Sequence, residues 1–332
     1  MTRSNGTLTA IRGVRVGHAQ DRKGTTGTTV VLLEPPAMAF ADSRGGWPGS
    51  YDTAASNLGK TFVERHALFL TGGDVFGFDA AKGIQAYVID RRLAKPRGAG
   101  SLPGVMGTNI YDLGFADVHG VDYAALGREA CEAASSGPVP QGNVGAGSGA
   151  TVGPFLDFKG HGTGTKGGLG ASSARAGPWT VGALFVSNCV GNVFDPFEGQ
   201  TIGGTLRKDR RGFLEMDDVL DAYLAGKPTR AGTTIGVLGT DAPLDHEQLA
   251  RIVELAHDGI ALAVRPAHMS TDGDTILGFS TGTRPRTRVD HRALDVLAHV
   301  AVRETARAIV NAVRAAASSG GVTAYGDLTL DR

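Results

Sequence analysis

The chain has 332 residues, of which 41% are hydrophobic and 20% charged, and its formal net charge at pH 7 is 0. This length suits one large or two medium domains with a sizeable core. Lys and Arg are scattered rather than gathered in a basic stripe, which argues against a nucleic-acid partner. No apolar run reaches membrane-spanning length, and the N-terminus lacks the apolar region of a signal peptide. We therefore expect a cytoplasmic protein with neither a membrane nor a nucleic-acid partner.

The cysteines, histidines and glycines of the chain indicate which kinds of site it can form. Cys131 and Cys189 are the two cysteines, and both are expected to be core thiols rather than a disulfide or metal pair. The nine histidines show no H-x-x-x-H spacing, so metal catalysis has little support and no cofactor is expected. The 50 glycines cluster beside apolar runs, where glycine makes tight turns and lets backbone approach a substrate closely.

The secondary structure predicted in chain order comes in separate blocks of strands and helices. Apolar runs bounded by turn residues predict strands at 28–33, 38–41, 66–70, 181–186, 235–238 and 276–280. Helical composition and periodicity, with Asp at candidate N-caps, predict helices at 79–89, 122–134, 245–264 and 290–317. The absence of regular βαβ alternation favours a layered α+β sandwich over a doubly wound sheet.

The dipeptide Gly232-Thr233 joins a turn-prone linker at 227–231 to the apolar run at 235–238. Gly232 can adopt backbone angles closed to other residues, so its carbonyl can turn toward the Thr233 hydroxyl. Cleavage of that bond would free an α-amine with a pKa near ~8. Such an amine beside a hydroxyl places general base and nucleophile on one residue. Taken alone, the dipeptide is more often an ordinary strand start.

Asp272-Gly273-Asp274 lies immediately before the predicted strand at 276–280. Residues two apart on an extended backbone face the same side, so both carboxylates can point at one amine. Two such groups can share a proton and shift each other's pKa. The alternative is a solvated turn or a partial calcium loop, although the later ligand positions of an EF-hand are absent.

Asn188 and Tyr111 are further candidates for a catalytic centre. Asn188 follows the predicted strand at 181–186, where its amide could donate to a developing oxyanion. Tyr111 could offer its phenol to the same centre. Their ordinary alternatives are a turn residue at a strand end and a core tyrosine with a hydrogen-bonded hydroxyl.

Two glycine-rich segments match nucleotide-binding patterns only in part. The segment at 145–150 reads GAGSGA, but the prolines around it do not fit the strand before and the helix after that a dinucleotide site requires. Lys166-Gly167-Gly168 lacks the residue order of a P-loop. We therefore do not expect nucleotide binding.

Taken in order, six segments resemble one family. They are GVRVGH at 13–18, DSRGG at 42–46, LTGG at 70–73, GAGSGATVG at 145–153, KGGLG at 166–170 and TDAPL at 240–244. This order is similar to that of the self-processing aminopeptidases and amidases of the D-aminopeptidase/β-aminopeptidase group, the P1 or S58 peptidases. The resemblance runs from about residue 13 to residue 318.

The resemblance implies a four-layer α-β-β-α sandwich of the N-terminal-nucleophile hydrolase type. It implies one domain over 1–332 that cleaves itself into 1–232 and 233–332, and a homo-oligomer of such α/β heterodimers. Thr233 with Asp272 and Asp274 is similar to the branch that contains the nylon-oligomer (6-aminohexanoate oligomer) hydrolases, whereas aminopeptidase members carry Ser and a Ser-x-Glu pair. By that resemblance Thr233 is the nucleophile, the two aspartates orient it, and Asn188 and Tyr111 line the site.

One position departs from the nylon-hydrolase pattern, which places a Lys after the Gly-rich loop where this chain has Pro154. We expect Lys166 to replace that lysine and to keep the aspartates ionised, or the Thr233 amine to suffice. The resulting hypothesis is a hydrolase of amides, peptides or amino-acid oligomers with an accessible amino end. The alternatives are an acyltransferase similar to ornithine acetyltransferases, and a binding protein with a catalytically weak site.

Overall fold

The computed structural model describes residues 6–94, 96–97, 100–153, 164–226, 231–282 and 289–331. Its helices are α1 (Ala80–Asp90), α2 (Tyr123–Glu132), α3 (Met216–Leu224), α4 (His246–Ala263) and α5 (His291–Arg314). Its longer strands are β1 (Val14–Gln20), β2 (Gly27–Ser43), β4 (Glu64–Thr71), β7 (Val105–Asn109), β10 (Gly168–Ala176), β11 (Trp179–Asn188), β14 (Thr233–Thr240) and β16 (Thr275–Ser280). The short strands are β3 (Ser50–Tyr51), β5 (Pro96–Arg97), β6 (Gly100–Ser101), β8 (Thr151–Val152), β9 (Thr165–Lys166), β12 (Asn192–Asp195), β13 (Gln200–Gly203) and β15 (Val264–Arg265).

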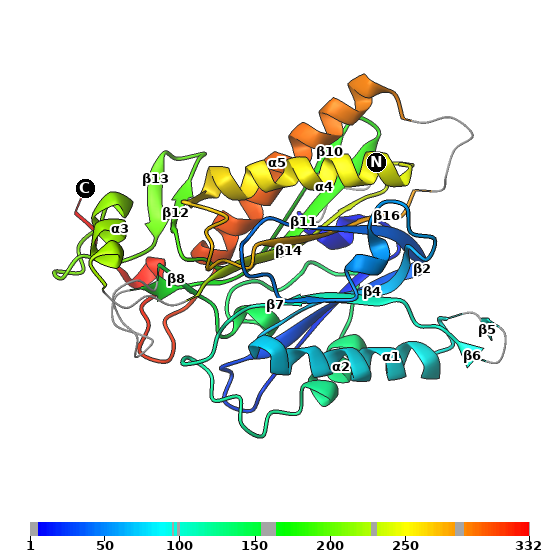
Figure 1. The fold of residues 1–332 in the computed structure, drawn as a ribbon, viewed down its shortest axis with the longest axis horizontal. Coiled ribbons are helices and arrows are strands. Elements are labelled where there is room, and N and C mark those ends of the chain that lie inside the picture. Colours follow the sequence, from blue (N-terminus) through cyan, green and yellow to red (C-terminus); the bar gives the residue numbers. More distant parts are fainter. Residues whose placement is uncertain are drawn as a thin grey trace.

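Strand β2 links two halves of one large sheet. The strand order is β10-β11-β14-β16-β2-β4-β7-β3, and β1 also pairs with β2. The end of β2 pairs with β16, whereas its beginning pairs with β4 and β1. Helices α4 and α5 lie on one side of the sheet halves and helices α1 and α2 on the other (Figure 1). The predicted α-β-β-α sandwich is therefore confirmed.

Alternating side chains on the strands fill the spaces between these layers. On β4, Leu68 belongs to the inner core between the sheet halves, and Phe69 packs toward α1 and α2. On β11, Val186 belongs to the inner core, and Phe185 packs toward α4 and α5. This period of two is what strands buried on both faces require.

The predicted elements are largely present, with one correction. Strands predicted separately at 28–33 and 38–41 are parts of the single 17-residue strand β2. Pro35 and Pro36 lie between them and have no backbone N–H to donate, so the pairing with β4 shifts register between Leu32 and Ala37 instead of continuing evenly. The proline pair interrupts the ladder without ending the strand.

The two long helices begin where the sequence predicts. The Asp245 side chain accepts a hydrogen bond from the Gln248 N–H and forms a capping box with it. Asp290 caps α5 by accepting from the Ala293 N–H. The predicted apolar face of α4, which includes Leu249 and Val253, is buried.

Strands β1, β7 and β10 and helix α3 were not predicted. Strand β10 reads GLGASSARA and is rich in small residues. A Cβ added to Gly170 would lie 2.1 Å from the carbonyl oxygen of Ala308 on α5. The small residues therefore let α5 pack directly on the strand backbone.

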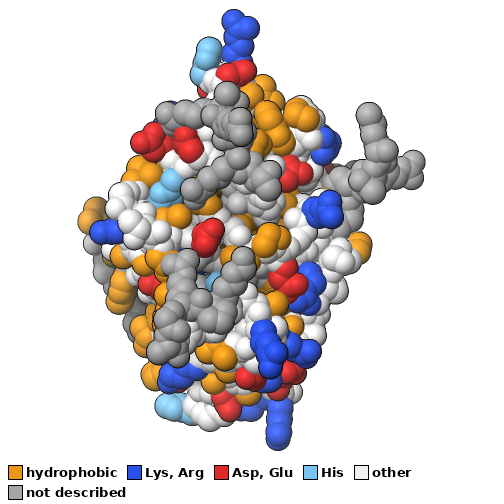
Figure 2. Space-filling model, turned by 90° about the vertical axis from the view of Figure 1, so that its right-hand side faces the viewer, with side chains coloured by type: hydrophobic (Ala, Val, Ile, Leu, Met, Phe, Trp, Pro, Cys, Tyr) orange, Lys and Arg blue, Asp and Glu red, His pale blue; other side chains and the backbone are white. Residues whose placement is uncertain are grey.

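Further findings concern the surface and the thiols. No helix in the described part of the chain is long and apolar enough to cross a membrane. Figure 2 shows basic and acidic side chains interspersed with hydrophobic ones on one face. Cys131 and Cys189 are free and buried, as predicted.

Candidate active site

Thr233 is the first residue of β14, in the middle of the large sheet. It pairs with Asn188 of the antiparallel neighbour β11, while β16 runs parallel on the other side. The Thr233 side chain is buried, and its hydroxyl donates a hydrogen bond to the carbonyl oxygen of Gly232. The hydroxyl therefore already lies against the carbonyl group of the peptide bond that the sequence singles out.

The Gly232 carbonyl has a second donor. The Gly273 N–H donates to its oxygen at 3.2 Å, and a Cβ added to Gly273 would lie 3.2 Å from Thr233 Oγ1. A backbone N–H aimed at a carbonyl oxygen stabilises negative charge that develops there during nucleophilic attack. Glycine at 273 thus lets backbone approach both the hydroxyl and the carbonyl.

The expected reason for glycine at 232 needs correction. Gly232 is not among the glycines with positive φ, so it does not use the left-handed region. Instead, a Cβ at this position would lie 2.4 Å from the Val190 N and 2.8 Å from the Cys189 carbonyl carbon. The glycine is required by close packing against the end of β11.

Asp274 is fully buried and hydrogen-bonded through both carboxylate oxygens. Oδ1 accepts from the Thr234 N–H at 2.7 Å, so it fixes the backbone directly after the candidate nucleophile. Oδ2 accepts from the His268 N–H at 2.9 Å and lies 2.8 Å from His268 Nδ1. This burial is incompatible with a solvated surface turn.

Asp272 is the second buried carboxylate, two residues away. Its Oδ1 accepts from the Val190 N–H at 3.3 Å and its Oδ2 from the Met269 N–H at 3.2 Å. Burial first, and the charge of Asp274 second, raise the pKa of Asp272 from 3.8 to about 7. A carboxyl group with this pKa can exchange a proton near neutral pH.

This pKa predicts a pH dependence of stability. The folded protein retains the Asp272 proton to higher pH than the unfolded chain does. The resulting stabilisation is fully present below pH 3.8 and is lost as pH rises through about 7. We expect urea titrations at about pH 5 and about pH 8 to show a smaller loss of unfolding free energy in Asp272→Asn than in the wild type. Equal losses in the two proteins would contradict the assigned pKa.

His268 is a site residue that the sequence analysis missed. It adopts φ of 59°, and its ring packs edge-on against the ring of the buried His257 at 5.0 Å between centroids. Burial lowers the pKa of His257 to about 3, so that ring is neutral. The one ion-pair partner of Asp274 among the described residues is therefore His268. Its side chain reaches Asp274 through a left-handed backbone conformation, which leaves no residue pattern in the sequence.

Asn188 connects three parts of the site. Its Nδ2 donates to the Tyr111 carbonyl at 3.1 Å, and its Oδ1 accepts from the Thr151 N–H at 3.0 Å. The side chain is fully buried. It thus positions the segments that carry Tyr111 and the Gly-rich loop, while its backbone pairs with Thr233.

Lys166 is buried beneath the Gly-rich loop. Its ammonium donates to the carbonyls of Gly147, Ala150 and Gly167 at 3.2, 2.8 and 3.0 Å, and lies 5.3 Å from the centre of the Phe115 ring. No contact in the described residues joins it to either aspartate. These contacts favour a structural role for Lys166 over its predicted role of keeping the two aspartates ionised. Pro154, where the pattern of the resemblance has Lys, lies outside the described residues.

Lys166→Met should therefore act first on stability. The substitution leaves carbonyl oxygens in the interior without their donor, and hydrogen bonds to a charged group contribute about 1.5–3 kcal/mol each. We expect a loss of about 3 kcal/mol of unfolding free energy, measured by urea denaturation. The matched control is Lys82→Met, because Lys82 pairs with Asp79 at the surface. A Lys166→Met protein as stable as this control would contradict the structural role.

Thr233 opens into a cavity of about 170 Å³. Its lining residues are Trp47, Pro48, Gly49, Asp74, Val75, Asn109, Tyr111, Ala231, Gly232, Thr233 and Thr271. The structure thus places Tyr111 at the cavity beside Thr233. Asp74 and Asn109 were not predicted as site residues.

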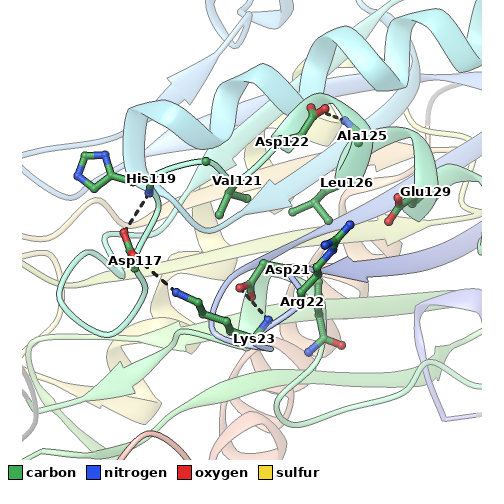
Figure 3. Close-up of a pocket in the computed structure, with 12 residues that line it drawn as sticks. Asp21, Arg22, Lys23, Asp117, His119, Val121, Asp122, Ala125, Leu126 and Glu129 are labelled. Carbon is green, nitrogen blue, oxygen red and sulfur yellow. Dashed lines mark hydrogen bonds and ion pairs between the residues drawn. The ribbon is translucent and has the colours of Figure 1, made fainter.

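A larger cavity, of about 600 Å³, shares no lining residue with the first. It lies where the turn after β1 meets the start of α2 (Figure 3). Several of its charged groups have partners: Lys23 pairs with Asp117 at 3.6 Å, and Asp122 caps α2. These contacts are those of a solvated surface rather than of a catalytic centre.

Solved structures share this fold. The structure of the β-aminopeptidase of a Burkholderia species superposes with a TM-score of 0.68 at 24% identity, over 97% of this chain and 91% of that one. The L-aminopeptidase D-Ala-esterase/amidase of Ochrobactrum anthropi, described as a variant of the Ntn hydrolase fold, gives 0.68 at 23% identity, over 95% and 88%. These likenesses show that the chain has the Ntn hydrolase fold.

Sequence comparisons identify the family. The sequence model of Peptidase family S58 matches residues 6–325. An uncharacterized aminopeptidase of Mycobacterium tuberculosis is 34% identical over 291 residues, covering 83% of this chain and 81% of the relative. The 6-aminohexanoate-oligomer endohydrolase of Paenarthrobacter ureafaciens is 30% identical over 275 residues, covering 81% and 73%. This chain belongs to peptidase family S58, and the resemblance seen in its sequence is confirmed.

Proposed function

We propose that this protein is a self-processing N-terminal-threonine amide hydrolase. It acts on peptides, amides or amino-acid oligomers with an accessible amino end. The observation that carries the proposal is the hydrogen bond from the Thr233 hydroxyl to the Gly232 carbonyl, whose oxygen also accepts from the Gly273 N–H. Hydroxyl and carbonyl are neighbours, and a backbone donor is already aimed at the oxygen where charge would develop.

Self-processing begins with attack of Thr233 Oγ1 on the Gly232 carbonyl carbon. The peptide C–N bond breaks, the nitrogen takes up a proton as the α-amine, and Gly232 is held as an ester on Thr233. Water then cleaves the ester, which releases the Gly232 carboxylate. Asp274, bound to the Thr234 N–H, keeps the strand start in place throughout.

Substrate hydrolysis repeats this chemistry on an external amide. The freed Thr233 amine takes the hydroxyl proton and passes it to the leaving amine. Asp272 and Asp274 orient the amine, and the Asn188 amide and the Gly273 N–H donate hydrogen bonds to the oxyanion. Tyr111 borders the substrate cavity. Water regenerates the free Thr233.

The sheet explains why the two products should stay together. Strand β14, which begins at the cleavage site, lies between β11 of the first product and β16 of the second, and β16 pairs with β2 of the first. Chains 1–232 and 233–332 would therefore share a hydrogen-bonded sheet. This proposal includes assembly of such pairs into a homo-oligomer, which the resemblance implies, and a cytoplasmic location.

Intact-mass analysis of the purified protein tests the proposal. We expect two chains, 1–232 and 233–332, that co-elute under native conditions and separate under denaturing ones. Turnover of aminoacyl p-nitroanilides should appear with the cleaved form. A fully active protein that stays uncleaved would overturn the self-processing mechanism.

A further inference from the structure

The cavity beside Thr233 contains the acyl side of the bond to be cleaved. Ala231 and Gly232 line it together with Thr233, and in self-processing Gly232 is the acyl group that Thr233 attacks. Once this chain end leaves, the acyl part of an external substrate takes its place. Whatever faces this cavity therefore contacts the acyl part of the substrate.

Among the described residues that line this cavity, Asp74 is the one with a charged side chain. It has no ion-pair partner in the described part of the chain, and partial burial raises its pKa. An ionised carboxylate in a narrow cavity without a cation is left incompletely solvated. A cationic group on a ligand would relieve this.

The backbone holds Asp74 in place. Its φ is 50° and follows Gly73 at 81°, and its N–H donates to the Ile110 carbonyl at 3.2 Å. The Gly73 N–H donates in turn to the buried Asp112 Oδ1 at 2.7 Å. A non-glycine residue in the left-handed region is strained, and such strain is concentrated at ligand-binding and active sites.

Asn109 supplies an independent sign that the cavity binds a polar ligand. The residue is 3% exposed and lines the same cavity, yet its Nδ2 has no hydrogen-bond partner in the described structure. A buried N–H group without an acceptor is unfavourable, so an acceptor on a ligand would satisfy it. At the rim, Trp47 and Val75 are 69% and 62% exposed and can cover an aliphatic segment.

We propose that Asp74 selects the substrate by binding an ammonium group on its acyl part, while the Asn109 amide donates to an acceptor on the same part. The substrate class is then an amide of an amino acid with a free amino group, held by its acyl side. This inference rests on the proposed function and assigns Asp74 as the residue that binds the amino group of the substrate. The Thr233 chemistry does not require Asp74, since self-processing involves no ammonium on the acyl side.

Binding and turnover test the assignment separately. The probes are 6-aminohexanamide and hexanamide, which differ in the ammonium group, measured by calorimetry on the full-length protein. The variants are Asp74→Asn and, as matched control, Asp79→Asn, which removes a surface carboxylate paired with Lys82. We expect Asp74→Asn to weaken 6-aminohexanamide binding about tenfold or more and to leave hexanamide binding unchanged. It should raise KM for aminoacyl p-nitroanilides by a similar factor, and maturation should proceed normally.

Equal binding of 6-aminohexanamide by wild type and Asp74→Asn would overturn the role of Asp74, whatever the turnover. Equal binding of the two probes by the wild type would overturn it as well. A third outcome is that Asp74→Asn no longer binds 6-aminohexanamide, while the wild type neither matures nor hydrolyses amides. That outcome would support the binding site and overturn only the proposed function. Reversal of selectivity in Asp74→Lys, toward a carboxylate-bearing acyl amide, would add direct support.

Discussion

Thr233→Ala is expected to remain one chain of 332 residues and to lose amide hydrolysis. The variant lacks the hydroxyl that contacts the Gly232 carbonyl, so the peptide bond has no internal nucleophile and the α-amine is never freed. Removal of a catalytic nucleophile lowers kcat by a factor on the order of 10⁴ or more. Intact mass measures the first effect and p-nitroanilide hydrolysis the second.

Thr233→Ser provides the matched control, because serine keeps the hydroxyl and, after cleavage, the α-amine. It should mature and keep measurable turnover, although the lost methyl group lets the hydroxyl rotate more freely. Both variants should fold, since Thr233→Ala removes only small groups from the strand start. Cleavage of Thr233→Ala at the same bond would show that another group performs the attack.

The layers of the fold could be predicted because the sequences of the long helices and strands show hydrophobic periodicity. Helix α4 carries both a capping aspartate and an apolar stripe, and both are found in the structure. Strand β10 could not be predicted, because its small residues serve close contact with α5 rather than hydrophobic alternation. The joining of two predicted strands into β2 depended on register across Pro35 and Pro36, which tertiary pairing decides.

The candidate site also contains some residues that the sequence could predict and others that it could not. Asp272 and Asp274 could be predicted as site residues because their spacing places two carboxylates within three residues. His268 and Asp74 were missed because each reaches the site through a left-handed backbone conformation, which no residue pattern indicates for non-glycine residues. Lys166 was identified, but its partners are carbonyls of a loop that a linear pattern cannot place.

Substitution of the buried carboxylates should lower both turnover and stability. Asp272→Asn removes the group whose pKa lies at about 7, and Asp274→Asn removes the charge that His268 faces at 2.8 Å. We expect each variant to lower kcat by about 10²-fold, which is typical for loss of an acid–base or orienting partner. In the uncleaved chain, the rate of self-processing should rise with pH through about 7 as Asp272 loses its proton, and Asp272→Asn should abolish this step.

The control is Asp295→Asn, which removes an exposed carboxylate from α5 and should leave both kcat and the pH profile of self-processing unchanged. Asparagine keeps one oxygen that accepts from the Thr234 or the Val190 N–H, but its amide nitrogen cannot accept from the His268 or the Met269 N–H. Each variant should therefore lose about 1–3 kcal/mol of unfolding free energy. Urea titrations at constant pH measure this loss. If both variants keep wild-type turnover, Asp272 and Asp274 only stabilise the start of the strand. The freed amine of Thr233 would then act without a carboxylate partner.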